Sequence, residues 1–311
     1  MATKTEMNSF AADFVKILDN QPGSEGPVFT MDGKFYMVAP EVEVDGKPAG
    51  QILRIDLENK KASVLVAPSV DGFGGIPAGC QCDLENNIWV ADMTLGILKV
   101  KQDGTFQQIA TKDNKNEALQ GCNDLIFDYE GNLWITAPAG PIAPHAFTRS
   151  DKEAFGSAYC YTKAGEVIKV ATGFKFSNGI AVQHSSNGIP VKLIVAETYH
   201  NSSLWSFDIV GPGKIKNKQL WGTLPGNPGP DGMDFDEEGN LIVANHGSGT
   251  LDVFGPNGGE PICRIKCPFK HPSNVHFRPD SNELYVTEHE FHGLWKLKWK
   301  NKGMKQYCER I

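Results

Sequence analysis

The chain has 311 residues, of which 40% are hydrophobic and 10% aromatic, so it can build a sizeable core and does not resemble a disordered protein. Its formal net charge of −7 argues against a nucleic-acid partner, which would require a basic stripe. The 33 glycines and 19 prolines exceed average usage but do not amount to low complexity.

The N-terminal segment, residues 1–20, mixes apolar residues with charged ones such as Lys4, Asp13 and Lys16. It therefore lacks the apolar stretch of a signal peptide, and no apolar run in the chain approaches the ~18 residues of a membrane helix. We expect a cytoplasmic protein without a membrane partner, whose seven cysteines are reduced thiols. Residues 9–18 could form one short helix or a strand.

From residue 25 onward, one phrase returns six times. Each copy begins with a small or polar residue, alternates apolar residues, passes a turn rich in Gly, Asn or Asp, and ends in an apolar strand. In chain order the copies read EGPVFTMDGKFYMV, AGCQCDLENNIWVAD, NDLIFDYEGNLWITA, NGIAVQHSSNGIPVKLIVAET, DGMDFDEEGNLIVANH and SNVHFRPDSNELYVTEH.

The last apolar residues before these turns follow one another at intervals of 42 to 55 residues. A period near 50 residues with a hairpin in each copy is typical of propeller blades of four strands. The sequence therefore predicts an all-β, six-bladed β-propeller in which residues 1–311 form a single domain. Two sandwiches of unrelated strands are the alternative, which six copies in phase disfavour.

Equivalent repeat positions of a propeller meet around one axis, because the innermost strand of every blade lines the central channel. The first position of the phrase holds two carboxylates and two amides among its six residues, which are Glu25, Ala78, Asn123, Asn178, Asp231 and Ser273. Two carboxylates brought together without a cation would repel each other. Carboxylate and amide oxygens match the oxygen shell of Ca²⁺, so we expect a central calcium site.

Three residues further into the phrase, Asp234 and His276 come from the fifth and sixth copies and should lie deeper in the same channel. They could form a buried hydrogen-bonded pair, or a second metal site completed by a backbone oxygen and water. The spacing alone does not decide between these alternatives.

Three short motifs suggest other chemistry and fail on their details. Asp234-x-Asp236-x-Glu238-Gly239 resembles the start of an EF-hand loop but has Asn245 at the twelfth position, so a hairpin turn is expected. His289-Glu290-Phe291-His292 lacks the H-E-x-x-H spacing of zinc proteases, and Gly247-Ser248-Gly249 lacks that of a serine nucleophile.

Longer stretches carry a resemblance that spans essentially the whole chain. The sequence closely resembles the calcium-dependent phosphotriesterases of the gluconolactonase-like propeller group. The stretches that carry it are PGSEGPVF from Pro22, APEVEVDGKPAGQILRIDL from Ala39, GGIPAGCQCD from Gly74, QGCNDLIFDYEGNLWITAPAG from Gln120, FSNGIAV from Phe176, PDGMDFDEEGN from Pro230 and CPFKHPSNVHF from Cys267.

This resemblance implies a six-bladed propeller with two calcium ions in its channel. The catalytic ion would be held by side chains from four repeat copies, Glu25, Asn123, Asn178 and Asp231. The structural ion would be held by Asp234, His276 and the backbone oxygen of Val275, which favours the metal alternative for this pair. The resemblance also makes His289 a pocket histidine, which we expect among the catalytic residues with the four side chains of the catalytic ion. It assigns pocket or channel positions to Arg149, Ser273 and Asn274. His246 departs from the pattern, which has Trp there, so we expect a difference in pocket shape and substrate preference while the metal ligands match.

The implied reaction is hydrolysis of the P–F bond of a small organophosphorus substrate such as diisopropyl fluorophosphate, with the phosphoryl oxygen bound to Ca²⁺. Asp231 would act either as the nucleophile or as the base that orients water. A gluconolactonase-like metal-dependent lactonase is the alternative enzyme, and a non-catalytic scaffold that binds another protein is an alternative of a different class. We expect a monomer, because a closed propeller needs no partner to protect its edges.

Overall fold

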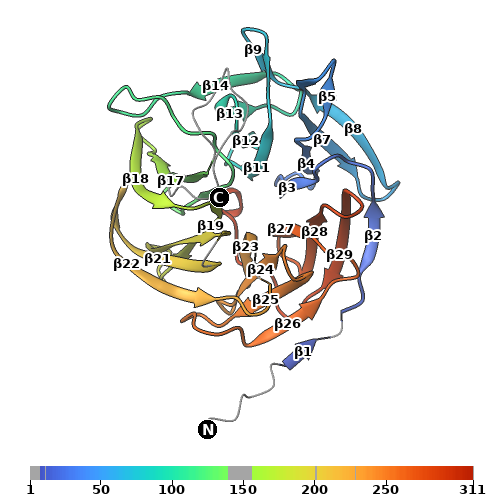
Figure 1. Ribbon diagram of the computed structural model, residues 1–311, viewed down its shortest axis with the longest axis vertical. Helices are drawn as coiled ribbons and strands as arrows, with labels where there is room; N and C mark the ends of the chain where they lie inside the picture. The colour runs from blue at the N-terminus through green and yellow to red at the C-terminus, as the bar shows by residue number, and fades with distance from the viewer. Residues whose placement is uncertain (1–7, 11, 139–155, 200–201, 228, 311) are drawn as a thin grey trace.

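The computed structural model describes residues 8–10, 12–138, 156–199, 202–227 and 229–310. Figure 1 shows an all-β ring of six blades around a central channel, as the repeat predicts. No helix in these ranges has the length and hydrophobicity needed to cross a bilayer. All seven cysteines are free, as expected.

Four blades consist of consecutive antiparallel strands, ordered from the channel outward as they occur in the chain. Blade 1 contains β3 (Glu25–Phe29), β4 (Phe35–Ala39), β7 (Gln51–Asp56) and β8 (Lys61–Val66). Blade 2 contains β11 (Pro77–Cys82), β12 (Ile88–Asp92), β13 (Gly96–Val100) and β14 (Phe106–Ala110). Blade 3 contains β15 (Leu125–Phe127), β16 (Leu133–Ala137), β17 (Gly156–Tyr161) and β18 (Val167–Phe174). Blade 4 contains β19 (Ser177–His184), β20 (Pro190–Glu197), β21 (Ser203–Gly211) and β22 (Lys214–Thr223).

The last two blades recruit strands from the beginning of the chain. Blade 5 contains β23 (Pro230–Phe235), β24 (Leu241–Asn245), β25 (Thr250–Phe254) and β26 (Cys263–Lys266), with β1 (Asn8–Phe10) added in parallel to β26. Blade 6 contains β27 (Pro272–Phe277), β28 (Glu283–Glu288) and β29 (Gly293–Lys298), completed by β2 (Val15–Leu18) on β29. The described residues of segment 9–18 therefore contribute strands and no helix, and β2 closes the ring by pairing with β29. Two hairpins project between strands, β5–β6 (Glu43–Val44 and Lys47–Pro48) and β9–β10 (Ser69–Val70 and Phe73–Gly74).

The core lies between the blades, in six hydrophobic clusters that each join two neighbours. Between blades 1 and 2, for example, Tyr36 and Val38 pack with Val90, and all three are fully buried. Burying one large apolar side chain stabilises a fold by about 1.5–3 kcal/mol. The ring is therefore held together mainly by contacts between blades.

A repeated aspartate stabilises the hairpin turns. The carboxylate of Asp128 accepts hydrogen bonds from the backbone N–H groups of Glu130 and Asn132 and from the indole of Trp134 at 2.9 Å. Asp236 does the same in blade 5, except that its indole donor is Trp299 of blade 6. The Asp236 segment is thus a hairpin turn, as predicted, and not an EF-hand loop.

The innermost strands crowd together where they enter the channel. A Cβ atom added to Gly179 would lie 2.0 Å from the backbone oxygen of Asp231, and one added to Gly232 would lie 2.1 Å from the Asn274 side chain. Glycine is needed at these positions because the neighbouring strand leaves no room for a side chain. The residues directly before them, Asn178 and Asp231, are consequently brought close to one another.

Candidate active site

A cavity of about 520 Å³ lies at the channel mouth where the innermost strands begin. Its lining includes first-position residues of five repeat copies, which are Glu25, Ala78, Asn123, Asn178 and Asp231, together with His289. The structure therefore brings together all four side chains predicted to hold the first calcium ion. Each comes from a different blade, so the site depends on closure of the ring.

The cavity is acidic, and His289 is the one basic side chain among its described lining residues. Glu25, Glu41, Glu43 and Asp231 line it, and no Lys or Arg occurs among its described lining residues. Asp231 is half-buried, and burial, followed by the carboxylates of Glu25 and Asp124, holds its pKa well above the usual range. A bound divalent cation would relieve this repulsion, so the donor set of carboxylates and amides fits calcium.

Thr198, the last residue of the fourth repeat copy, contacts the side chain of one predicted ligand and the backbone beside another. The Asn178 amide Nδ2 donates to the Thr198 hydroxyl at 3.1 Å, and that hydroxyl donates to the Pro230 carbonyl at 2.7 Å. Thr198 thus connects Asn178 of blade 4 with the residue directly before Asp231 of blade 5. Because the nitrogen is engaged, the amide oxygen of Asn178 remains as an acceptor for a cation.

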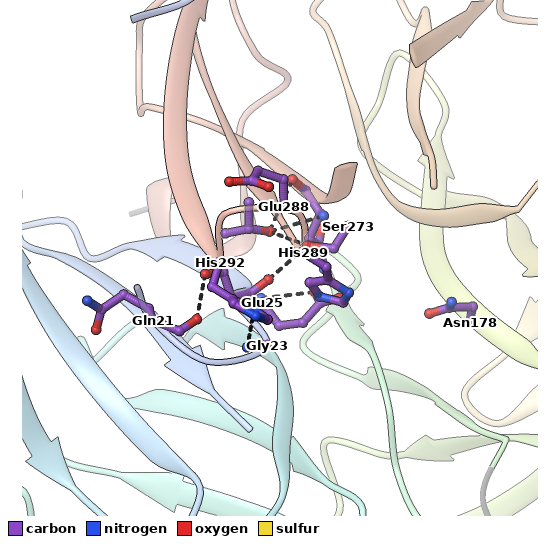
Figure 2. A network of polar contacts seen from close by, with 12 residues as sticks. Gln21, Gly23, Glu25, Asn178, Ser273, Glu288, His289 and His292 are labelled. Carbon is purple, nitrogen blue, oxygen red and sulfur yellow. Dashed lines mark hydrogen bonds and ion pairs between the residues drawn. The ribbon is translucent and has the colours of Figure 1, made fainter. Parts of the chain in front are cut away.

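His289 contacts Glu25 across the junction of blades 6 and 1. Figure 2 shows the two side chains joined, with Asn178 across the opening. Nε2 of His289 lies 3.4 Å from Oε1 of Glu25. Burial lowers the pKa of His289, but Glu25 outweighs this effect and the net pKa is raised. The pocket histidine is therefore stabilised in its charged form by one of the predicted calcium ligands.

The loop after β28 fixes the position of His289. Oε2 of Glu288 accepts hydrogen bonds from the backbone N–H groups of Glu290 at 2.7 Å and Phe291 at 2.8 Å. Nδ1 of His292 accepts one from the Gly23 N–H at 2.9 Å, which ties the loop to the residues before Glu25 (Figure 2). Both Glu25 and His289 are thus held by the same turn.

His246 belongs to a group of three imidazoles beside the cavity. Its ring stacks on His271 with centroids 4.6 Å apart and meets His289 edge-on at 5.4 Å. Burial, followed by the neighbouring His289 and His271, lowers the pKa of His246 to about 4. His246 is therefore neutral near pH 7 and contributes an aromatic surface.

The remaining predicted pocket residues are not among the described lining residues of this cavity. Ser273 is fully buried, and its hydroxyl donates to the Ser24 carbonyl at 2.8 Å, so it connects blade 6 to blade 1 and is not among the cavity's lining residues. Asn274 lies deeper in the channel, where its Oδ1 accepts from the Val275 N–H at 2.9 Å. Arg149 lies outside the described residues.

Asp234, Val275 and His276 line a second, much smaller cavity of about 10 Å³ deeper in the channel. Nδ1 of His276 and Oδ2 of Asp234 are 3.7 Å apart, which is beyond hydrogen-bond distance. Burial lowers the pKa of His276 to about 4 and raises that of Asp234 to about 7. A neutral imidazole is the form that binds a metal, so the residues fit a second ion.

Asp124 lies between the two cavities and was not singled out from the sequence. It lines the small cavity, and burial, with the Glu25 and Asp234 carboxylates adding to it, raises its pKa to about 8. It follows Asn123 at a position where four other copies have glycine, and this substitution is the signal that could have identified it.

No group of three or more His, Cys, Asp or Glu side chains within the described ranges is arranged to hold a metal ion. Both candidate sites therefore depend on amide or backbone carbonyl oxygens as additional donors. This composition favours a hard cation such as calcium over zinc.

Comparison with known proteins agrees with this geometry. Residues 23–290 match the family described as SMP-30/Gluconolactonase/LRE-like region. The chain belongs to this family. The chain is 58% identical to a diisopropyl-fluorophosphatase from Loligo vulgaris over 301 residues, which cover 96% of each chain. It is 24% identical to a gluconolactonase from Zymomonas mobilis, over 76% of this chain and 67% of the relative.

A solved structure supports the fold. The calcium-binding protein regucalcin from Agrobacterium tumefaciens superposes with a TM-score of 0.74 at 19% identity, over 98% of this chain and 99% of that one. This likeness shows the propeller architecture shared with the SMP-30/gluconolactonase family. The predicted family and fold are thus confirmed.

Proposed function

We propose that this protein is a calcium-dependent phosphoric triester hydrolase that cleaves the P–F bond of diisopropyl fluorophosphate and related phosphofluoridates. The observation that carries the proposal is the convergence of Glu25, Asn123, Asn178 and Asp231 in one acidic cavity whose described lining lacks Lys and Arg. The 58% identity to a diisopropyl-fluorophosphatase over nearly the whole chain supports the same activity.

The two candidate cavities would hold one calcium ion each. Glu25, Asn123, Asn178 and Asp231 would bind the catalytic ion, while Asp234, His276 and the Val275 carbonyl would bind the structural one. When bound, calcium supplies a Lewis acid that polarises the phosphoryl oxygen and stabilises developing negative charge.

The protein itself supplies shape and orientation. A cavity of about 520 Å³ lies within the roughly 300–1,000 Å³ range of small-molecule sites. Val42, Ile76, Met93 and Phe176 in its lining offer apolar contacts for the alkyl groups of a neutral ester. His289 acts as a positioning residue, because its Nε2 lies 3.4 Å from Oε1 of Glu25.

Asp231 has two possible roles. As nucleophile, its carboxylate oxygen forms a bond to phosphorus, the P–F bond breaks and fluoride leaves. Water then attacks the carboxyl carbon of the acyl phosphate, the C–O bond breaks so that the aspartyl oxygen leaves with the phosphate product, and the carboxylate is restored. As base, Asp231 only orients the attacking water. A single turnover in heavy-oxygen water separates these roles, because label in the Asp231 carboxylate supports the first and label only in the product excludes it.

The family match and the gluconolactonase relative favour one second candidate, a metal-dependent lactonase on the same site. Paired assays distinguish the two: fluoride release from diisopropyl fluorophosphate, and acid release from a sugar lactone. We expect fluoride release to dominate and to be lost in Asp231→Asn. Elemental analysis showing no bound metal would instead favour the non-catalytic scaffold.

We also propose that the protein is a cytoplasmic monomer. The free cysteines and the closure of the ring by β2 on β29 support this proposal. Light scattering after size-exclusion chromatography tests the monomer, and a mass near 68 kDa, twice the chain's 34.0 kDa, would contradict it.

A further inference from the structure

The C-terminal tail, residues 303–310, crosses the channel at the mouth opposite the candidate active site. It follows β29 and ends in the 3-10 helix η1 (Tyr307–Glu309). Figure 1 shows this red segment over the middle of the ring. The tail contacts the ends of the innermost strands, where the N–H of Met304 donates to the Phe235 carbonyl at 2.8 Å.

Three side chains anchor the tail in three different clusters between blades. Met304 packs against the cluster of blades 4 and 5, and Cys308 is buried in that of blades 1 and 2. Tyr307 packs against the cluster of blades 2 and 3, with its ring stacked on Phe127 at 4.8 Å. A tail that only extended the last strand would not contact these distant blades.

Polar contacts add to this anchoring at Tyr129. Its hydroxyl donates to the Lys305 carbonyl, and the Arg310 guanidinium lies over its ring at 4.0 Å. Chain ends usually fray unless they are tied down. The segment 303–310 is held by contacts to blades 1 to 5. These contacts indicate that the segment has a role of its own in the channel.

Gln306 connects the tail to the second candidate calcium site. Its side chain is 8% exposed, and its Nε2 donates to Oδ1 of Asp234 at 3.0 Å. The other hydrogen bonds to this carboxylate come from the backbone N–H groups of Phe235 at 2.9 Å and Phe277 at 3.0 Å. Gln306 is thus the side chain that fixes the carboxylate from outside the strands that form the site.

We propose that residues 303–310 are a built-in plug that closes this mouth of the channel, and that Gln306 positions Asp234 for the second calcium ion. This inference rests on the proposed function, because it requires that ion. It follows that the second calcium ion, at Asp234 and His276, exchanges with solvent only when the tail detaches. The channel then has a single open mouth, the one used by substrate.

The test uses the full chain loaded with radiolabelled calcium. Gln306→Met keeps the volume of the side chain and removes the donor, while Gln107→Met on the exposed face of β14 is the matched control. Release of label into excess EGTA is followed by rapid filtration. We expect Gln306→Met to release one of two ions about 10–100-fold faster than the unmodified protein, since residues that orient metal ligands contribute this much to affinity. The control should release both ions as the unmodified protein does.

A second variant separates the plug from the single hydrogen bond. Tyr307→Ala loosens the tail without touching Asp234, and we expect it also to speed release of the same ion. Unchanged release in Tyr307→Ala would overturn the plug, and unchanged release in Gln306→Met would overturn the positioning role. A merely structural role would lower the unfolding midpoint of both variants without altering release. If the unmodified protein binds no calcium, the proposed function itself fails. If it binds two ions and both variants release them at the normal rate, only the further inference fails.

Discussion

The carboxylates at the two mouths of the channel differ in the partners that the protein provides for them. At the closed mouth, Asp236 accepts hydrogen bonds from two backbone N–H groups and from the side chains of Asn240, Trp299 and Asn301. At the open mouth, Glu25 and Asp231 share a cavity whose described lining contains no Lys or Arg. Carboxylates satisfied by the protein stabilise the turn, whereas carboxylates left facing one another favour a cation from outside.

The same contrast appears in how the mouths are covered. The tail fills the end of the channel near Phe127 and Phe235, and its side chains enter the clusters between blades. The beginning of the innermost strands is left as a cavity of about 520 Å³. Changes at the open mouth should therefore cost activity, and changes at the closed mouth should cost stability.

The largest effect is expected at Asp231. Asp231→Asn should lower kcat/KM for fluoride release by at least about 10³-fold, because the amide can neither attack phosphorus nor balance the cation's charge. Glu25→Gln should act in the same direction. Asp103→Asn, in an exposed turn of blade 2, is the matched control and should retain full activity. Full activity in either site variant would remove the catalytic-calcium assignment.

Metal removal should affect both mouths at once. EGTA should abolish activity and lower the thermal midpoint, because an ion bound only by the folded chain stabilises it by about 2.7 kcal/mol at a hundredfold excess over its Kd. Re-added calcium should restore both quantities. A calorimetric midpoint that EGTA leaves in place, in protein shown to contain calcium beforehand, would contradict this prediction.

Acid should weaken the closed mouth through His184. Burial, with the charge of Arg310 adding to it, lowers the pKa of His184 to about 4, compared with about 6.5 for an unfolded histidine. Its contribution to stability is therefore complete above about pH 6.5 and is lost as the pH falls through about 4. We expect a loss on the order of 2 kcal/mol over this range.

His184→Gln provides the comparison for this loss. Glutamine can still accept the hydrogen bond that the Tyr129 N–H donates to His184 at 3.1 Å, but it does not titrate. Urea unfolding at pH 7 and pH 5 should show a smaller difference for this variant than for the unmodified protein. Equal differences would mean that His184 does not contribute to acid sensitivity.

The smallest effect is expected at Tyr307. Tyr307→Ala removes the ring stacked on Phe127 and should lower the free energy of unfolding by about 1–2 kcal/mol. KM for substrate, measured with calcium in excess, should be unchanged because the opposite mouth is intact. Val44→Ala, at a side chain that is 60% exposed, is the control for loss of apolar surface. A raised KM in Tyr307→Ala would show that the two mouths are coupled.

The sequence by itself determined the ring and the residues that face its axis. Six copies in phase place Glu25, Asn123, Asn178 and Asp231 at one repeat position, and a propeller brings such positions together whatever its loops do. The Asp236 turn could also be predicted, because a hairpin is set by its own few residues. Periodicity and turn chemistry are local signals, so they can be found without coordinates.

Only the tertiary structure decided how distant segments meet. The contact between Glu25 and His289, the hydrogen bond from Gly23 to His292 and the addition of β2 to β29 all join the beginning of the chain to its end. Gln306 reaches Asp234 across the channel, and Asp124 takes its place between the two cavities. No repeat or local propensity encodes these contacts, because they exist only once the ring has closed and every blade has a neighbour on both sides.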